Sequence, residues 1–324
     1  MNSTVKERDY FFDNYRFLLI FLVVVGHFIE PCFRNHPMLS ILKGIIFSFH
    51  MPAFIFISGY FSKKTSSLKK LIQTLLIPYF VYEVVYYILY IYALHAETKL
   101  YLAYPKFTLW YLIALFAWRI VAPWFQKLPF HLPLAFLGGL LIGLTDLDNF
   151  LSIPRIVYFF PFFLAGMDFK PEGVKILRTS QYQRPLLIIG LPITLAGLAA
   201  LCYCTSSIQI FYGRYAYKSM NLRPLEGILT RILCYVISFA LIFAVMMLIS
   251  GKKLPCSYIG QRTMPIYIFH GLLFQSIDRT SEFLSEIQTL PEVIFLLMMC
   301  LFLVWFFSTK PFLFITNKIA HLIS

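Results

Sequence analysis

Long apolar runs separated by short polar segments recur along the whole chain. A run of about 18 apolar residues can cross the hydrocarbon layer as a helix, and these runs do not alternate in the roughly 10-residue units of a β-barrel. Ten candidate spans can be drawn, at residues 15–33, 42–61, 71–94, 108–125, 130–147, 152–169, 186–205, 228–250, 258–277 and 291–315. The pattern therefore predicts an all-α, polytopic membrane protein with ten transmembrane helices.

Composition supports this class. Of the 324 residues, 59% are hydrophobic and 13% charged, whereas soluble domains carry about 25% charged residues. The net charge of +13 would suggest nucleic acid in a soluble protein, but here most basic residues lie in short loops, as the positive-inside rule describes. No nucleic-acid partner is expected. No linker or soluble insertion interrupts the sequence, so residues 1–324 are predicted to form one transmembrane domain.

The same rule predicts orientation. With the N-terminus inside, most lysines and arginines face inward, and an even number of spans places both termini in the cytoplasm. The main exception is the outward segment that follows the seventh span. Its basic residues are Arg214, Lys218, Arg223 and Arg231.

The first predicted span carries three polar side chains on one face. Arg16 and His27 are eleven residues apart, about three helical turns, so both point the same way. Asp13 lies three residues before Arg16 and can pair with it. At about 1.5 Å per residue, His27 lies roughly 16 Å deeper than Arg16. Ionisable groups at such depth are costly and usually functional.

Three other ionisable residues, His50, Glu83 and His270, fall within the same predicted hydrocarbon layer. Four such groups facing lipid separately would be unfavourable, whereas one polar cavity accommodates them together. We therefore expect a shared cavity in the middle of the bilayer, open to the inner side past Arg16 and the lysines of residues 63–70. On this basis Glu83 and His270 are predicted to contact substrate.

The residue types suggest acid–base chemistry. A neutral imidazole can take a proton from a hydroxyl near working pH, which makes His27 a candidate general base. His50, near the helix-kinking Pro52, would assist it or bind substrate. Arg16 offers a planar donor fork suited to phosphate, with Asp13 orienting it. The alternatives are backbone hydrogen bonds for the histidines and a membrane-edge anchor for the arginine.

Basic and aromatic residues at the span ends suggest further contacts. The densest basic cluster would hold an acidic cofactor, in addition to setting topology and contacting anionic membrane lipids. Its members are Lys63, Lys64, Lys69 and Lys70. Arg155 and Trp110 are predicted to contact a sugar substrate, the alternatives being snorkelling and an interfacial aromatic belt.

Several other chemistries have no support in the sequence. The motifs GxGxxG, Walker A, HExxH and GxSxG are absent, so neither those cofactor sites nor a covalent serine intermediate is indicated. The six cysteines lack CxxC spacing and are interpreted as small apolar residues. No metal is expected.

Four motifs together resemble the membrane-bound acyltransferase family 3, and within it the fucose 4-O-acetylase-like branch. They occur in the family's order and extend over nearly the whole chain. The matching segments are Asp13–Arg16 with Gly26-His27, Phe47–Tyr60, Leu109–Leu112 with Phe160–Gly166, and Gly260–His270.

This resemblance implies about ten helices and an O-acetyltransferase in a plasma membrane, namely a bacterial inner or cytoplasmic membrane. Such enzymes commonly transfer acetyl from acetyl-CoA to a cell-surface polysaccharide, glycolipid or lipid-linked sugar precursor. It implies that Arg16 and His27 are essential. Some members carry paired arginines where this chain has Lys69-Lys70, which puts donor binding there in doubt. The alternative function is a transporter or flippase for an anionic lipid or sugar, and a third is a sensor without turnover.

Overall fold

The computed structural model describes residues 10–147, 149–177, 179–205 and 208–322. Regular structure in these ranges is helical, with short 3₁₀ and π turns beside the α-helices. The α-helices are α1 (Phe11–Phe28), α2 (Pro37–Tyr60), α3 (Leu68–Leu71), α4 (Ile77–Ile88), α5 (Trp110–Phe125), α6 (His131–Leu141), α7 (Ile153–Asp168), α8 (Pro171–Leu177), α9 (Ser180–Pro185), α10 (Leu191–Thr205), α11 (Pro224–Leu248), α12 (Ser257–Gly260), α13 (Thr263–Thr280), α14 (Leu290–Phe307) and α15 (Lys310–Ala320).

Helices occupy all ten predicted ranges, which confirms the all-α, polytopic class. Within the described residues, seven helical stretches are long and apolar enough to cross a bilayer, and two further apolar helices, Trp110–Phe125 and His131–Leu144, are shorter. The last predicted span is too long: α14 ends at Phe307, and α15 folds back to pack against α4 and α13.

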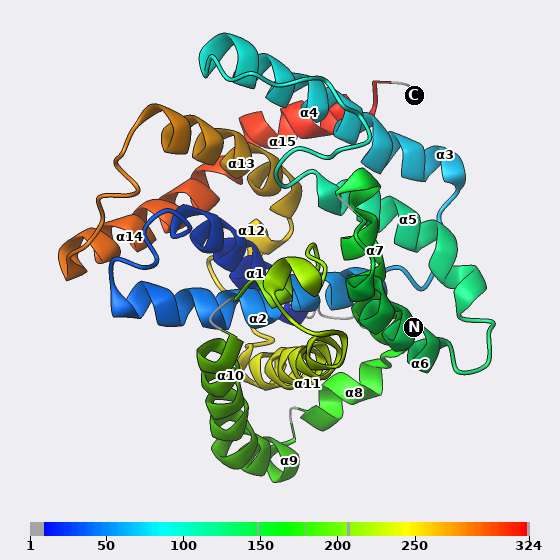
Figure 1. The fold of residues 1–324 in the computed structure, drawn as a ribbon. Helices are drawn as coiled ribbons and strands as arrows, with labels where there is room; N and C mark the ends of the chain where they lie inside the picture. The colour runs from blue at the N-terminus through cyan, green and yellow to red at the C-terminus, as the bar shows by residue number, and fades with distance from the viewer. Residues whose placement is uncertain (1–9, 148, 178, 206–207, 323–324) are drawn as a thin grey trace, which may run out of the picture.

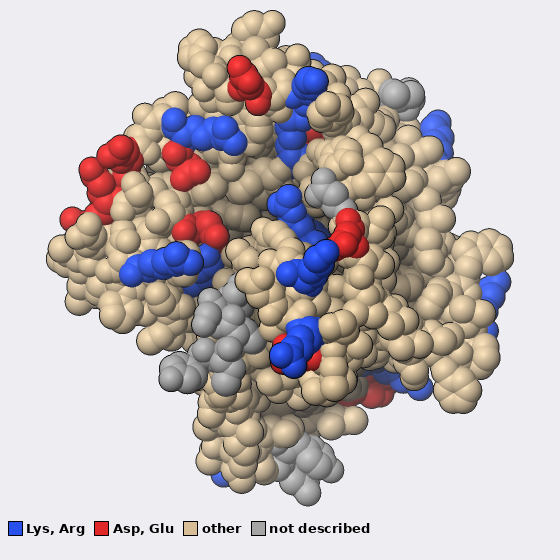
Figure 2. Space-filling model, viewed as in Figure 1, with Lys and Arg blue, Asp and Glu red and all other residues tan. Residues whose placement is uncertain are grey.

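The centre of the molecule is formed by α1 and α2 (Figure 1). The longer of the two, α2, contacts α1, α7, α10 and α11, while α1 also contacts α12, α13 and α14. On one face of the molecule, Lys and Arg side chains gather around a hollow near its middle (Figure 2). The two central helices, α1 and α2, therefore position the side chains that lie between them and the surrounding helices.

Glycines explain how closely α2 and α7 cross. A Cβ at Gly59 would overlap the carbonyl oxygen of Phe163, and one at Gly166 would overlap that of Phe56. Small residues let helix backbones approach this closely in a membrane. Gly59 and Gly166 therefore permit the close crossing of α2 and α7.

The first and last motifs meet where α12 packs on α1. A Cβ at Gly260 would overlap the carbonyl oxygen of Asp13. Next to this contact, Asn14 Nδ2 donates to the carbonyl oxygens of Ser250 (2.7 Å) and Lys252 (2.9 Å), and Ser257 Oγ donates to Asn14 Oδ1 (2.6 Å). Buried polar groups bonded in this way fix the start of α1 firmly.

Candidate active site: two cavities that meet at Met51

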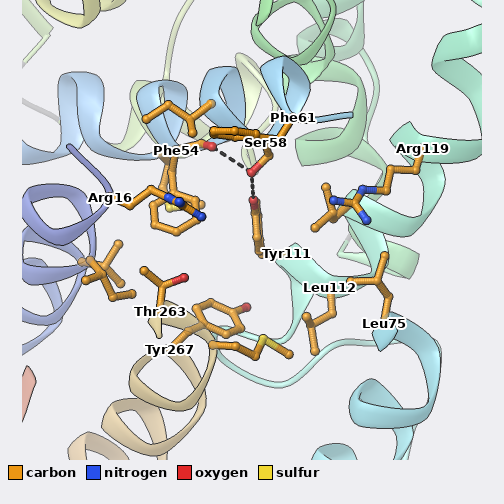
Figure 3. Close-up of a pocket in the computed structure, with 16 residues that line it drawn as sticks. Arg16, Phe54, Ser58, Phe61, Leu75, Tyr111, Leu112, Arg119, Thr263 and Tyr267 are labelled. Carbon is orange, nitrogen blue, oxygen red and sulfur yellow. Dashed lines mark hydrogen bonds between the residues drawn. The ribbon is translucent and has the colours of Figure 1, made fainter. Parts of the chain in front are cut away.

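The first cavity lies between the N-terminal half of α1 and the helices α2, α5 and α13. Its volume is about 210 Å³. Arg16 and Arg119 point into it from opposite sides, with Tyr111 between them (Figure 3). The rest of its lining is mainly apolar and includes Ile20 and Val23. We call it the Arg16 cavity.

Arg16 is held in place by its own helix and, through Asp13, by Gln261, which directly follows α12. Its Nη2 donates to Asp13 Oδ1 at 2.6 Å, and its Nε donates to the carbonyl oxygen of Phe12 at 3.3 Å. The other carboxylate oxygen of Asp13 accepts a hydrogen bond from Gln261 Nε2 at 3.0 Å. The buried Asp13 therefore joins Arg16 to the Gly260–His270 segment, and the predicted pairing of Asp13 with Arg16 is confirmed.

Arg119 is the second cation of this cavity. Its Nε donates to Ser62 Oγ at 3.2 Å, which ties α5 to the end of α2. Nearby, the hydroxyls of Tyr111 and Ser58 are 2.6 Å apart, and Ser58 Oγ donates to the carbonyl oxygen of Phe54. The cavity thus combines two guanidinium groups with a narrow apolar interior.

The second cavity, of about 280 Å³, lies at the opposite end of α1. We call it the His27 cavity. It is lined by His27, Glu30, Phe47, His50, Met51, Pro105, Phe107, Trp110, Asn149, Arg155, Phe159, Phe211, Tyr212, Arg214 and Tyr215. The lining is aromatic and polar, a mixture that suits sugars, whose faces stack on rings and whose hydroxyls need hydrogen bonds.

Three histidines gather at this cavity. His50 Nδ1 is 2.6 Å from the carbonyl oxygen of Ile46, and His270 Nδ1 is 2.8 Å from that of Ile266. A carbonyl only accepts, so each Nδ1 carries its proton and each Nε2 keeps a free lone pair. The sequence analysis gave hydrogen bonds to the backbone as the alternative role of the histidines. His50 and His270 do form such bonds, yet the Nε2 atom of each stays available.

His27 differs from the other two. Within the described part of the chain, neither of its ring nitrogens has a hydrogen-bond partner. Its ring packs beside Phe107 and His270, with centroids 4.7 and 5.4 Å away. His270 is fully buried behind it and does not itself line the cavity, and its Nε2 is unsatisfied. His27 is therefore the imidazole in this group whose ring nitrogens are both uncommitted.

Arg155 and Trp110 lie side by side in the same cavity. The guanidinium of Arg155 lies 5.0 Å from the centre of the Trp110 ring, and that ring stacks on Phe159 at 5.6 Å. Arg155 Nη1 also approaches Asn149 Oδ1 at 3.5 Å. The two residues predicted to contact a sugar thus line the same cavity as His27 and His50.

Met51 lines both cavities, so the two meet at this side chain. Along α1, Arg16, Ile20 and Val23 line one cavity and His27 lines the other, with spacings that keep all four on one helix face. The sequence predicted a single cavity, and the structure divides it. Ile20 and Val23, which lie between Arg16 and His27 on this face, are buried, and together with Met51 they separate the two polar ends.

The other predicted site residues lie elsewhere. Glu83 is fully buried and lines neither cavity; it accepts from the backbone nitrogen of Lys106 at 2.6 Å and pairs with its Nζ at 3.4 Å. Lys63 Nζ donates to the carbonyl oxygen of Phe169. Burial lowers the pKa of Lys63, against the opposing effect of Asp168 and Glu172.

All four lysines of the basic cluster are exposed, and none of them lines the Arg16 cavity. Their binding of an acidic cofactor and substrate binding by Glu83 stay predictions.

The sequence analysis missed Arg119, Met51 and Arg214. Arg119 lies inside an apolar span, so the rule that charges within spans are usually functional could have found it. Arg214 was noted only as an exception to the positive-inside rule. Met51 carries no signal of its own, because a methionine in a helix normally packs against apolar neighbours.

Comparison with known proteins gives one match. The family model for an acyltransferase domain, acyltransferase family 3, matches residues 9–309. No curated protein and no solved structure matches the chain. In the described part of the chain, no group of three or more His, Cys, Asp or Glu side chains could hold a metal ion.

Proposed function

This chain belongs to acyltransferase family 3, and we propose that it is a membrane O-acetyltransferase. The donor is cytoplasmic acetyl-CoA, and the acceptor is a hydroxyl of a cell-surface polysaccharide, glycolipid or lipid-linked sugar precursor. The observation that carries the proposal is that a cavity with two arginines and a cavity with three histidines beside it meet at Met51.

The Arg16 cavity suits the donor. Acetyl-CoA carries several phosphate charges, and guanidinium groups bind phosphate through two parallel hydrogen bonds. A volume of about 210 Å³ is too small for the whole molecule. The narrow pantetheine arm therefore enters, while the phosphates stay near Arg16 and Arg119. The apolar walls guide the thioester toward Met51.

The His27 cavity suits the acceptor. His27 takes the proton of a sugar hydroxyl, whose oxygen attacks the thioester carbonyl. The carbon–sulfur bond then breaks, and the CoA thiolate leaves and takes up the proton that His27 carries. General base catalysis of this kind contributes about 10²–10⁴-fold. The new carbon–oxygen bond leaves the acetyl group as an ester on the sugar.

Because His50 Nε2 keeps a free lone pair, His50 is better suited to accept a hydrogen bond from a substrate hydroxyl than to donate one to the oxyanion. A donor in the cavity lining is the indole N–H of Trp110. It can stabilise the negative charge that develops on the carbonyl oxygen.

Acetyl-CoA and the sugar acceptor then approach from opposite sides of the membrane. The positive-inside rule puts Arg16 at the cytoplasmic end of α1, and it puts the segment that carries Arg214 on the outer side of the membrane. Acetyl transfer across the membrane follows, with no need for the acceptor to enter the cytoplasm.

Deleting the gene tests the proposal. Base-labile acetate on the surface glycan of the deletion cells should fall, and the intact gene on a plasmid should restore it. Unchanged acetate would contradict an acetyltransferase. A transporter would instead move a labelled substrate across vesicles of the purified protein without consuming acetyl-CoA.

A further inference from the structure

Two arginines in the His27 cavity have no acidic partner among the described residues. Arg155 contacts the Trp110 ring and Asn149, and Arg214 lies over the ring of Tyr215 at 5.6 Å. In the residues the structure describes, neither guanidinium forms an ion pair with a carboxylate. Two uncompensated positive charges therefore face the space beside His27.

The acidic residue in the lining of this cavity is Glu30, and Lys43 already neutralises its charge. Its carboxylate pairs with Lys43 Nζ at 2.8 Å, and the hydroxyl of Tyr212 donates to it at 3.4 Å. Burial, followed by the charge of Glu30, raises the pKa of Tyr212, so its hydroxyl stays protonated and remains a donor. Because Lys43 cancels the charge of Glu30, the excess charge of the cavity stays positive.

The segment that carries Arg214 is held firmly over the cavity. Arg231 is buried in α11 and donates to the carbonyl oxygens of Tyr215 (3.1 Å) and Gly139 (3.0 Å). Its guanidinium lies between the rings of Tyr158 and Tyr217, at 5.0 and 4.7 Å. An arginine fixed next to Tyr215 in this way holds the backbone that presents Arg214.

Two of these residues also account for part of the departure from the positive-inside rule. Arg214 and Arg231 belong to the basic segment predicted to face outward, where cations are otherwise scarce. Arg231 has a structural role, whereas Arg214 is exposed and lines the cavity. Basic side chains are visible around the hollow in Figure 2. Binding a negatively charged ligand gives Arg214 a function on the outward-facing side of the protein.

We propose that the acceptor is anionic, with a carboxylate or phosphate bound between Arg155 and Arg214 while a neighbouring hydroxyl faces His27. This inference rests on the proposed acetyltransferase function and names its substrate class. Both anions present paired oxygens that match the guanidinium fork. Because His27 and both arginines line this one cavity of about 280 Å³, the anion lies on or next to the acetylated sugar. A uronic acid within the glycan and the pyrophosphate of a lipid-linked sugar are the two sources of this chemistry.

The test uses the unacetylated glycan fraction from deletion cells as acceptor and labelled acetyl-CoA as donor, with the purified full-length protein. One portion has its carboxylates reduced to alcohols. A second portion is treated with mild acid, which removes a lipid pyrophosphate. One treatment should lower kcat/KM at least about tenfold, the range expected when a charge-assisted hydrogen bond is lost. The portion that responds identifies the source of the anion.

Variants connect this effect to the arginines. The double variant Arg155→Gln with Arg214→Gln should raise the acceptor KM about 10- to 100-fold and should no longer distinguish treated from untreated glycan. Lys218→Gln removes a charge from the same segment without lining the cavity and should behave as wild type. Arg214→Lys, which keeps the charge, should retain part of the discrimination.

The outcomes separate the two proposals. If deletion cells lose no acetate, the acetyltransferase function fails and this inference fails with it. If acetate is lost but neither treatment changes kcat/KM, the acceptor is neutral and this inference alone is overturned. An effect of mild acid that persists in the double variant would reflect loss of the lipid tail and would also overturn it.

Discussion

Arg16 and His27 share one face of α1 yet line two different cavities. Their eleven-residue separation corresponds to roughly 16 Å along the helix. One helix therefore presents a guanidinium to one cavity and an imidazole to the other. This relationship gives the predictions below their direction, because changes at the two ends should affect different kinetic constants.

The first prediction concerns His27. His27→Asn should lower kcat for acetyl transfer about 100-fold or more, since it removes the general base, while the KM for acetyl-CoA changes little. Radiolabel transfer by the purified protein measures both constants. His95→Asn alters an exposed histidine outside both cavities and should be silent. Equal activity of the two variants would exclude His27 as the base.

The second prediction separates Arg119 from the lysine cluster. Arg119→Gln should raise the KM for acetyl-CoA about tenfold or more at any salt concentration, because a direct charge-assisted hydrogen bond is lost. Replacing Lys69 and Lys70 by Gln should raise it at low salt only, since exposed charges act at long range and are screened. Kinetics at two ionic strengths distinguish the effects. A salt-independent defect in the lysine variant would instead indicate direct contact with the donor.

Met51 offers a third prediction. Met51→Trp should block the junction of the cavities, so acetyl-CoA still binds while transfer falls about 100-fold, as expected when reacting groups cannot reach alignment. Equilibrium binding and single-turnover transfer measure the two steps. Met51→Leu is close in volume and should keep most activity. A fully active tryptophan variant would mean that the thioester does not pass Met51.

The fourth prediction concerns the contact between α12 and α1. Gly260→Ala should destabilise the protein by about 1–3 kcal/mol, the usual cost of overpacking, because the new Cβ overlaps the backbone of Asp13. Thermal unfolding in detergent should show a lower midpoint. Gly197→Ala is the matched control, because nothing lies within 4 Å of a Cβ there, and it should leave the midpoint unchanged or raise it. Equal midpoints would show that α12 moves away at little cost.

Much of this fold could be predicted from the sequence because each element leaves a local signal. Apolar runs located the helices, and the spacing of Asp13 and Arg16 predicted their ion pair. Each of these depends on neighbours in the chain or on the composition of one segment. The turn at Ser308 and Thr309 was missed because α15 is placed by packing against α4 and α13.

The site was less predictable because the depth of a residue in the membrane does not determine which way its side chain points. Glu83 and His50 both fall within the predicted hydrocarbon layer, yet Glu83 pairs with Lys106 while His50 lines the cavity. The division into two cavities depends on the apolar side chains between Arg16 and His27, which no polar pattern reveals. Long-range packing of α2, α5 and α7 decides these points.

The central claim is that acetyl passes from the Arg16 cavity to the His27 cavity across the membrane. It is tested most directly in sealed liposomes that contain the purified protein. With labelled acetyl-CoA trapped inside and unacetylated glycan outside, label should appear on the glycan, and His27→Asn should abolish it. With both substrates outside and an empty lumen, no transfer should occur; label on the glycan under that condition would contradict the account.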